Sequence, residues 1–219
     1  MFKKDLSLVC STTKRSYEYI KEIKNNKIKT NIVIVYENKK NKNKHLLNEI
    51  LFFLKKFNFK FIFIKNSHIN KKSFSKIIFK YTKKNILLSL YPGEIIKNSS
   101  FFQKRNCFHN HTGLLPSYRG STTIYYSILK EKKIYCTTFK INKNIDDGII
   151  LYTNKYNFPK KKMNIDEYDN IIRAKHFVKF LKGETGINKK NLHEEIYYTI
   201  HPVLRNIAHK VFNDNLDIG

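Results

Sequence analysis

The chain has 219 residues, 41% of them hydrophobic and 14% aromatic, which is enough apolar material for a folded domain and excludes a disordered chain. Its formal net charge is +26, but only five of the 43 Lys and Arg residues are arginines, and the lysines are spread through every segment. This pattern favours a general compositional bias over a specific nucleic-acid surface, although the charge would attract anionic small molecules.

The cysteines and the first residues indicate the compartment. The three cysteines, at positions 10, 107 and 136, have no paired spacing and suit a reducing environment better than a disulfide scaffold. The first twenty residues include lysines and an aspartate, and their apolar run is too short for a signal peptide or a membrane span. We therefore expect a cytoplasmic protein without a membrane span.

Apolar runs alternate with helical periods over the first ninety residues. The predicted strands lie at 6–10, 31–36, 61–64 and 86–90. The predicted helices lie at 14–25, at 45–58 and around 74–81. Strands that are apolar on both faces and separated by helices are typical of a parallel sheet covered on both sides. We therefore predict an α/β fold with a Rossmann-like, doubly wound, mostly parallel sheet flanked by helices.

The second half continues with helices and strands. A helix is predicted at 122–129, strands at 134–141 and 149–152, and a helix at 166–181. Gly183 and Gly186 then break the pattern before a final segment at 193–212. We predict an α/β domain over 1–182 and a short helical C-terminal extension over 183–219. The extension would be part of the same domain, a lid, or the contact of a homodimer.

The first strand is followed by the sequence STTK, from Ser11 to Lys14, and not by a glycine-rich phosphate loop. This disfavours a nicotinamide-binding enzyme and a P-loop NTPase. Two other breaks follow strands, at residues 91–94 and at the stretch CFHNHTGLLPSYRG, which begins at Cys107. Ligands of open α/β sheets bind at the carboxyl ends of strands, so both breaks are candidate parts of a site.

The stretch from Cys107 to Gly120 contains two closely spaced histidines. In an extended chain Cys107, His109 and His111 would point the same way. These residue types can bind zinc, but no further ligand cluster with zinc spacing occurs, and we predict no metal site. The histidines could also serve only to hydrogen-bond a loop. The remaining interpretation is catalytic.

Two motifs support the catalytic interpretation. The first is His111-x-x-Leu-Leu-Pro-x-Tyr-Arg-Gly120, and the second is Asp146-Asp-Gly-Ile-Ile-Leu151 about thirty residues later. Together they resemble the signature of the folate-dependent formyltransferases. The resemblance is good over roughly 86–155, and over the N-terminal third it extends only to the architecture. By itself the Asp-Asp-Gly sequence would indicate a hairpin turn.

The resemblance implies a reaction and assigns residues to it. A formyl group would pass from 10-formyltetrahydrofolate to a primary amine, with an oxyanion to stabilise and an amine proton to remove. His111 would hydrogen-bond the formyl oxygen, and Asp146 would orient His111 and help to move the proton. Asp147 is the less favoured partner, because the aspartate of the family lies two residues before the glycine.

His109 is a departure from the family pattern, which has asparagine two residues before the catalytic histidine. A neutral histidine can donate one hydrogen bond, so we predict His109 as a third catalytic residue that stabilises the oxyanion. The alternative is that a local bulge turns Asn110 toward the site. Asn110 is therefore also a candidate for substrate contact.

The resemblance also predicts the residues that bind the two reactants. The folate would lie between the loop after the fourth strand and the loop that precedes the aspartate. The cofactor-binding candidates are Leu90, Tyr91, Pro92, Gly93, Ile141 and Ile145. Tyr118 and Arg119 are candidates for substrate binding, and Arg119 would either anchor an anion or pair with a nearby backbone carbonyl.

The C-terminal part of the chain favours one subclass. Fewer than seventy residues follow the aspartate motif, which is too few for the C-terminal β-barrel that the resemblance implies for methionyl-tRNA formyltransferases. Residues 11–15 do not resemble the glycine-rich loop of glycinamide ribonucleotide formyltransferases. We predict an N-formyltransferase acting on an amino sugar, nucleotide-linked, in polysaccharide biosynthesis. The alternatives are a methionyl-tRNA formyltransferase-like enzyme and an altered homologue that only binds folate or nucleotide.

Overall fold

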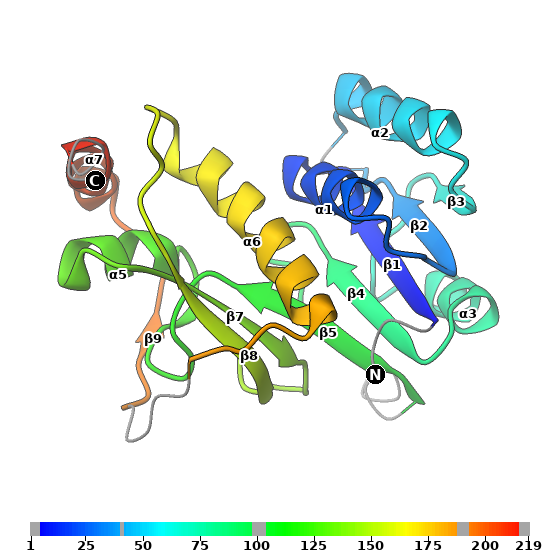
Figure 1. The fold of residues 1–219 in the computed structure, drawn as a ribbon. Coiled ribbons are helices and arrows are strands. Elements are labelled where there is room, and N and C mark those ends of the chain that lie inside the picture. The colour runs from blue at the N-terminus through cyan, green and yellow to red at the C-terminus, as the bar shows by residue number, and fades with distance from the viewer. Residues whose placement is uncertain (1–4, 40–41, 98–103, 188–192, 215–219) are drawn as a thin grey trace. The chain divides into compact units, whose positions relative to one another are not determined.

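The computed structural model of the chain describes residues 5–39, 42–97, 104–187 and 193–214 (Figure 1). The chain forms two compact units, Met1–His109 and Asn110–Gly219, which we describe in turn. Strands of both belong to a seven-stranded sheet with the order β3-β2-β1-β4-β5-β7-β8. The predicted α/β fold with a mostly parallel sheet and flanking helices is therefore confirmed.

The first unit is a parallel α/β layer. Its strands are β1 (Leu6–Ser11), β2 (Ile32–Tyr36), β3 (Phe61–Ile64), β4 (Asn85–Ser89) and the beginning of β5 (Asn106–His111). Its helices are α1 (Lys14–Asn25), α2 (Lys44–Lys56) and α3 (Lys72–Tyr81). Every residue of β1, β2 and β4 is buried, as their continuous apolar runs predicted. α1 begins where predicted, because the Thr13 side chain accepts a hydrogen bond from the backbone N–H of Ser16.

Where the structure describes it, the second unit combines an antiparallel strand pair with three helices. Its strands after β5 are β6 (Arg119–Gly120), β7 (Ile134–Lys140), β8 (Ile149–Tyr156) and β9 (Ile196–Tyr197). Its helices are α5 (Thr123–Glu131), α6 (Ile165–Lys182) and α7 (Pro202–Asp214). β7 and β8 are antiparallel, and the short strands β6 and β9 form a separate parallel pair.

Several elements of the second unit differ from the sequence prediction. β8 continues to Tyr156, four residues beyond the predicted end, because its pairing with β7 runs on to Ile134 after the apolar pattern has stopped. The final segment is not only helical. It begins with β9, and α7 starts at Pro202, whose missing N–H suits the first turn of a helix.

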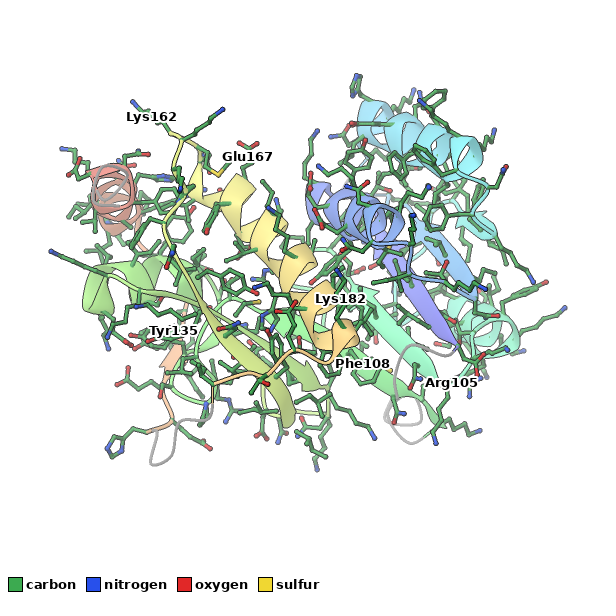
Figure 2. All side chains as sticks on the ribbon, in the orientation of Figure 1. Arg105, Phe108, Tyr135, Lys162, Glu167 and Lys182 are labelled. Carbon is green, nitrogen blue, oxygen red and sulfur yellow. The ribbon has the colours of Figure 1, made fainter. Side chains whose placement is uncertain are left out.

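The C-terminal segment contributes to the core of the second unit. Ala208 and Phe212 of α7 are fully buried in a cluster that includes Ile124 and Ile128 of α5 and Ile172 of α6. A second cluster joins Leu114, Tyr118 and Tyr135, and Tyr135 of β7 is labelled in Figure 2. α6 ends at Lys182, and Gly183 follows with a φ of +77°. The domain boundary predicted at residue 182 stays a prediction.

Candidate functional site

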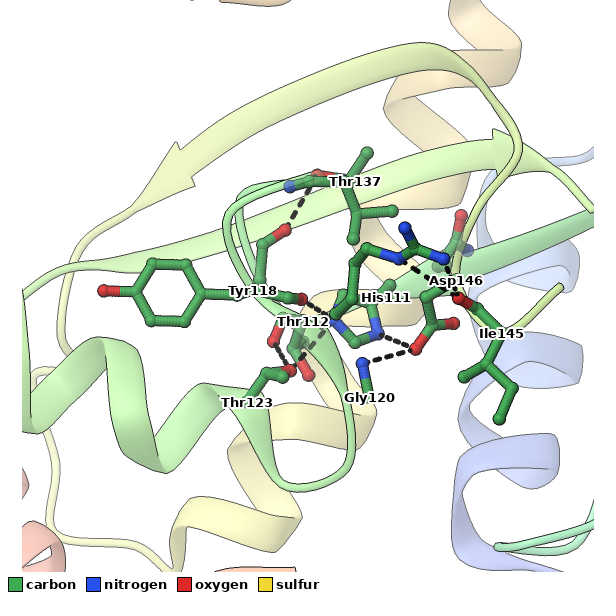
Figure 3. A network of polar contacts seen from close by, with 12 residues as sticks. His111, Thr112, Tyr118, Gly120, Thr123, Thr137, Ile145 and Asp146 are labelled. Carbon is green, nitrogen blue, oxygen red and sulfur yellow. Dashed lines mark hydrogen bonds and ion pairs between the residues drawn. The ribbon is translucent and has the colours of Figure 1, made fainter. Parts of the chain in front are cut away.

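His111 ends β5, and only 3% of its surface is exposed. Its Nε2 lies 2.6 Å from the backbone oxygen of Tyr118 and 3.0 Å from the hydroxyl of Thr123 (Figure 3). A carbonyl oxygen only accepts hydrogen bonds, so Nε2 carries the ring proton and donates a hydrogen bond to the backbone oxygen of Tyr118. The Thr123 hydroxyl itself donates to the backbone oxygen of Thr112 at 2.6 Å. A neutral His111 therefore has its lone pair on Nδ1.

Asp146 lies on the side of His111 that carries this lone pair. Its Oδ2 is 3.4 Å from Nδ1 of His111 and accepts a hydrogen bond from the backbone N–H of Gly120 at 3.0 Å (Figure 3). Asp146 has a φ of +47°, a left-handed conformation that aspartate adopts more readily than most residues. The two sequence motifs thus meet within the second unit. The catalytic roles of His111 and Asp146 stay predictions.

The neighbouring Asp147 has a different environment. Its carboxylate accepts hydrogen bonds from Asn144 at 2.6 Å and from Asn142 at 3.5 Å. The hydrogen bond from Asn144 holds the pKa of Asp147 below its usual value. The Asp147 side chain therefore closes the turn of its own loop, while the Asp146 side chain faces His111.

Burial determines the charge of His111. Desolvation lowers its pKa below the ordinary histidine value, and the nearby Asp146 carboxylate offsets part of this effect by raising the pKa. Arg173 adds to the lowering. At neutral pH the ring is uncharged, so Nδ1 can accept a proton beside a carboxylate that would neutralise the resulting imidazolium.

Gly113 makes the contact between His111 and Tyr118 possible. A Cβ atom at this position would lie 2.9 Å from Nε2 of His111 and 3.0 Å from the backbone oxygen of Tyr118. Real Cβ atoms essentially never approach other atoms within 3.0 Å, so any larger residue would have to displace the ring or the loop. The glycine of the motif is therefore required by close packing around the histidine.

A buried network beside His111 was not predicted from the sequence. Arg173 of α6 donates to Asp169 at 2.8 Å, to the hydroxyl of Thr112 at 2.7 Å and to the backbone oxygen of Asn110. It thus holds the residues on both sides of His111. The sequence signal for this network is the spacing of Asp169 and Arg173, which lie four residues apart on a predicted helix. Exposed ion pairs on helices have the same spacing, so the signal does not indicate a buried pair.

Asn110 belongs to the same network. It is fully buried, its Oδ1 accepts from the Thr138 hydroxyl at 2.6 Å, and its Nδ2 donates to the backbone oxygen of Arg173 at 3.1 Å. Both polar groups of the side chain therefore have partners within the second unit. The predicted contact of Asn110 with a substrate stays a prediction.

Tyr118 and Arg119, the other substrate-binding candidates, contact the protein itself. The Tyr118 hydroxyl donates to Glu131 at 2.7 Å, and its ring stacks on Tyr197. Arg119 donates to the backbone oxygen of Ile145 at 2.9 Å. This is the backbone contact that the sequence left open as the alternative to an anion. Binding of a substrate by either residue stays a prediction.

The candidates after β4 lie in the first unit. Tyr91 is 4% exposed, its hydroxyl accepts from the backbone N–H of Thr12 at 3.3 Å, and its ring meets Tyr36 edge-on. Leu90 is also buried, whereas Pro92 and Gly93 are exposed. Pro92 and Gly93 are therefore the accessible members of this predicted folate-binding group.

His109, predicted as the oxyanion donor, has its Nδ1 3.2 Å from the backbone oxygen of Leu88. The carbonyl can only accept, so a neutral His109 carries its single proton on Nδ1. A donor role for Nε2 then needs the charged ring or a change of tautomer. The role predicted for His109 stays a prediction.

The two isoleucines predicted to contact folate lie in the second unit. Ile141 is half-buried, and Ile145, directly before Asp146, is 54% exposed. Ile149 and Ile150, just after the aspartate motif, are also exposed. Exposed apolar side chains thus stand on both sides of Asp146 in the sequence. Over the described part of the chain, no group of three or more His, Cys, Asp or Glu residues could hold a metal ion.

Comparison with known proteins assigns the chain to a family. The formyl transferase family model matches residues 3–176, which is most of the chain and includes both motifs. The chain belongs to the formyl transferase family. This confirms the family that the two motifs resemble. No helix among the described residues is long and apolar enough to cross a membrane.

One curated relative is the methionyl-tRNA formyltransferase of Prochlorococcus marinus (strain MIT 9312). It is 28% identical over 107 residues, and these are 48% of this chain but 29% of the relative. The chain thus spans less than a third of that relative's length in the match. This comparison supports the family, but it does not extend the activity of the whole relative to this chain.

Solved structures of several subclasses share the fold. A sugar N-formyltransferase from Shewanella sp FDAARGOS_354 has a TM-score of 0.59 at 15% identity, covering 94% of this chain and 87% of that one. Phosphoribosylglycinamide formyltransferase from Anaplasma phagocytophilum has a TM-score of 0.57 at 15% identity, covering 81% and 84%. An N-formyltransferase from Helicobacter canadensis, in complex with folinic acid and dTDP-3-aminofucose, has a TM-score of 0.50 at 15% identity, covering 89% and 70%. At these identities the likeness shows the formyltransferase fold alone.

Proposed function

We propose that this family member transfers a formyl group from 10-formyltetrahydrofolate to the primary amine of a small molecule, and that His111 and Asp146 carry the proton transfer. The observation that supports this most directly is the 3.4 Å approach of the Asp146 carboxylate to the unprotonated nitrogen of a buried, neutral histidine. Folinic acid, a formylated folate, is bound in a solved structure of the same fold.

The geometry favours His111 as the proton acceptor, and not as the hydrogen-bond donor to the formyl oxygen that the resemblance implies. Its Nε2 proton is held by the Tyr118 oxygen, so Nδ1 is the nitrogen that takes up a proton. During formyl transfer the amine nitrogen bonds to the formyl carbon, the bond from that carbon to the folate nitrogen breaks, and one amine proton is released. Nδ1 can receive that proton, and Asp146 stabilises the imidazolium that forms. The folate nitrogen takes a proton in return.

The formyl donor requires an apolar surface for its flat ring. Ile145 provides such a surface next to Asp146 in the second unit, and Pro92 is an exposed apolar residue in the first. We therefore retain the folate-contact group of Leu90, Tyr91, Pro92, Gly93, Ile141 and Ile145 as part of the proposal. Ile145 and Pro92 are its exposed side chains.

We propose an amino sugar, nucleotide-linked, as the acceptor. Only Thr12 and Thr13 lie between β1 and α1, with Thr13 as the N-cap, and this leaves no glycine-rich loop for a ribonucleotide phosphate. The sugar N-formyltransferase structure also covers 94% of the chain, against 81% for the phosphoribosylglycinamide enzyme. The net charge of +26 would favour the approach of an anionic nucleotide sugar.

The proposal is tested by mass spectrometry of products. The full chain is incubated with 10-formyltetrahydrofolate and a panel of nucleotide-linked amino sugars, with glycinamide ribonucleotide in a parallel reaction. The proposal predicts an amino sugar that gains one formyl group, at a rate about two to four orders of magnitude lower with His111→Asn. Formylation of glycinamide ribonucleotide alone would contradict the proposed acceptor but agree with the proposed reaction. Absence of formylation with every amine, despite tight folate binding, would contradict the reaction itself.

A second acceptor is favoured by the 28% identity to a methionyl-tRNA formyltransferase. The same assay with initiator tRNA charged with methionine tests it. Formyl-methionine released from that tRNA, at a rate above that for any amino sugar, would replace the amino sugar in our proposal. The His111–Asp146 chemistry would be the same for both acceptors.

A further inference from the structure

We propose that Arg119 and the segment Glu194–Tyr197 are positioning elements that hold Asp146 opposite His111. The C-terminal segment would then be part of the active site without touching the substrate. This inference rests on the proposed function for its activity assay, and it has a second test that needs no activity.

The Arg119 guanidinium links two segments. Its Nη2 and Nε donate to the backbone oxygen of Ile145 at 2.9 and 3.3 Å, directly before Asp146. Its Nη1 donates to the Glu194 carboxylate at 3.1 Å, and Nη2 lies 3.9 Å from Asp147. Only 12% of the Arg119 side chain is exposed. The planar guanidinium can make these contacts together, whereas a lysine ammonium could not span them.

The backbone beside Arg119 makes the second link. The N–H of Gly120 donates to Oδ2 of Asp146, the same oxygen that approaches His111. Arg119 and Gly120 thus contact the Asp146 loop through a side chain and through a main-chain group. These two residues are the whole of β6, so the placement of Asp146 depends on where β6 is held.

β6 is held by β9. Arg119 pairs with Ile196 and Gly120 with Tyr197, and the backbone N–H groups of Arg119 and Ser121 donate to the C-terminal segment at 2.9 Å each. Gly120 has a φ of +101°, and a Cβ atom there would lie 2.2 Å from the backbone oxygen of Tyr197. This glycine allows the two strands to approach so closely.

β9 is itself fixed to the second unit by side chains. The Tyr197 ring stacks on Tyr118 at 5.2 Å between ring centres. Lys130 of α5 donates to Glu195 at 2.9 Å and to the Tyr197 hydroxyl at 2.7 Å. The chain of contacts therefore runs from α5 through β9 and β6 to Asp146. Since the family match ends at residue 176, residues 194–197 lie outside it.

The activity test is a double-mutant cycle in the full chain. If Arg119 acts through Asp146, Arg119→Ala should lower kcat about 10²-fold with little change in KM, because a small misplacement of a catalytic group has that effect. In an Asp146→Asn background the same change should cost less than about threefold, since residues that act as a unit are not additive. Glu194→Gln should give a smaller loss in the same direction. Glu184→Gln is the matched control, because Glu184 forms an ion pair with Lys179 on the surface, at 3.6 Å.

The second test follows the His111 ring by ¹⁵N NMR and assigns its signals with His111→Gln. The Asp146 carboxylate raises the pKa of His111, so both Arg119→Ala and Asp146→Asn should lower it, and the double variant should lower it no further. This readout stays valid if no acceptor amine is found. A His111 titration that is unchanged in Arg119→Ala would overturn the proposal. An unchanged kcat with a raised KM would also overturn it, because Arg119 would then bind the substrate.

Discussion

Acid should destabilise the second unit through His176. This side chain of α6 is fully buried. Its Nδ1 accepts a hydrogen bond from the Tyr156 hydroxyl at 2.9 Å, and its Nε2 donates one to the backbone oxygen of Tyr152 at 3.3 Å. Burial lowers the pKa of His176 from 6.5 to about 3. The folded chain therefore binds fewer protons than the unfolded chain between these pH values, and its stability falls as the pH falls through this window.

The magnitude follows from the size of this window. Each pH unit below the unfolded pKa costs about 1.4 kcal/mol, so lowering the pH from 6.5 to 4 should remove about 3 kcal/mol of the free energy of unfolding through this residue. Urea unfolding of wild type and His176→Gln across this range measures the difference between their slopes. His45→Gln, at an exposed histidine, is the matched control. Parallel curves for wild type and His176→Gln would refute the reasoning. Because the experiment follows unfolding and not turnover, it also distinguishes acid unfolding from a loss of activity in acid.

Three further predictions follow from the site. Gly113→Ala should lower turnover about 10²-fold, because its Cβ would lie 2.9 Å from Nε2 of His111. Steady-state kinetics measures this, with a thermal melt as the folding control, and unchanged turnover would contradict it. If His109 stabilises the oxyanion, His109→Ala should lose about 10²–10³-fold in kcat and His109→Asn should keep most activity, whereas damage confined to Asn110→Ala, at equal stability, would transfer the role to Asn110. If the net charge of +26 is compositional, binding of duplex DNA and tRNA should weaken steeply with salt and show no sequence preference in a titration; specific tRNA binding at physiological salt would contradict this.

The sequence predicted the parts of the fold that depend on local pattern. β1, β2 and β4 are buried on both faces, so their sequences are largely apolar and differ clearly from the helical periods between them. The meeting of His111 and Asp146 also followed from the sequence, but through the spacing of two motifs that a known family shares. Without that resemblance, Asp146 would have been read as part of a hairpin turn.

The remaining features depend on contacts that no local pattern records. β9 is two residues long and forms only because β6 lies beside it. Arg173 is buried because Thr112 and the backbone of Asn110 satisfy its guanidinium, whereas its spacing from Asp169 is the same as in an exposed ion pair. For Arg119 the sequence left a substrate anion and a backbone carbonyl as equal alternatives. The contact with Ile145 became visible only in the structure.

The central claim is that His111 and Asp146 act as one unit in formyl transfer. Its most direct measurement is the rate of formylated product by mass spectrometry, at saturating amine and 10-formyltetrahydrofolate, for wild type, His111→Asn, Asp146→Asn and the double variant. Each single change should lower turnover by about two to four orders of magnitude, and the double variant should be little slower than the slower single variant. Turnover of His111→Asn at the wild-type rate would contradict the claim.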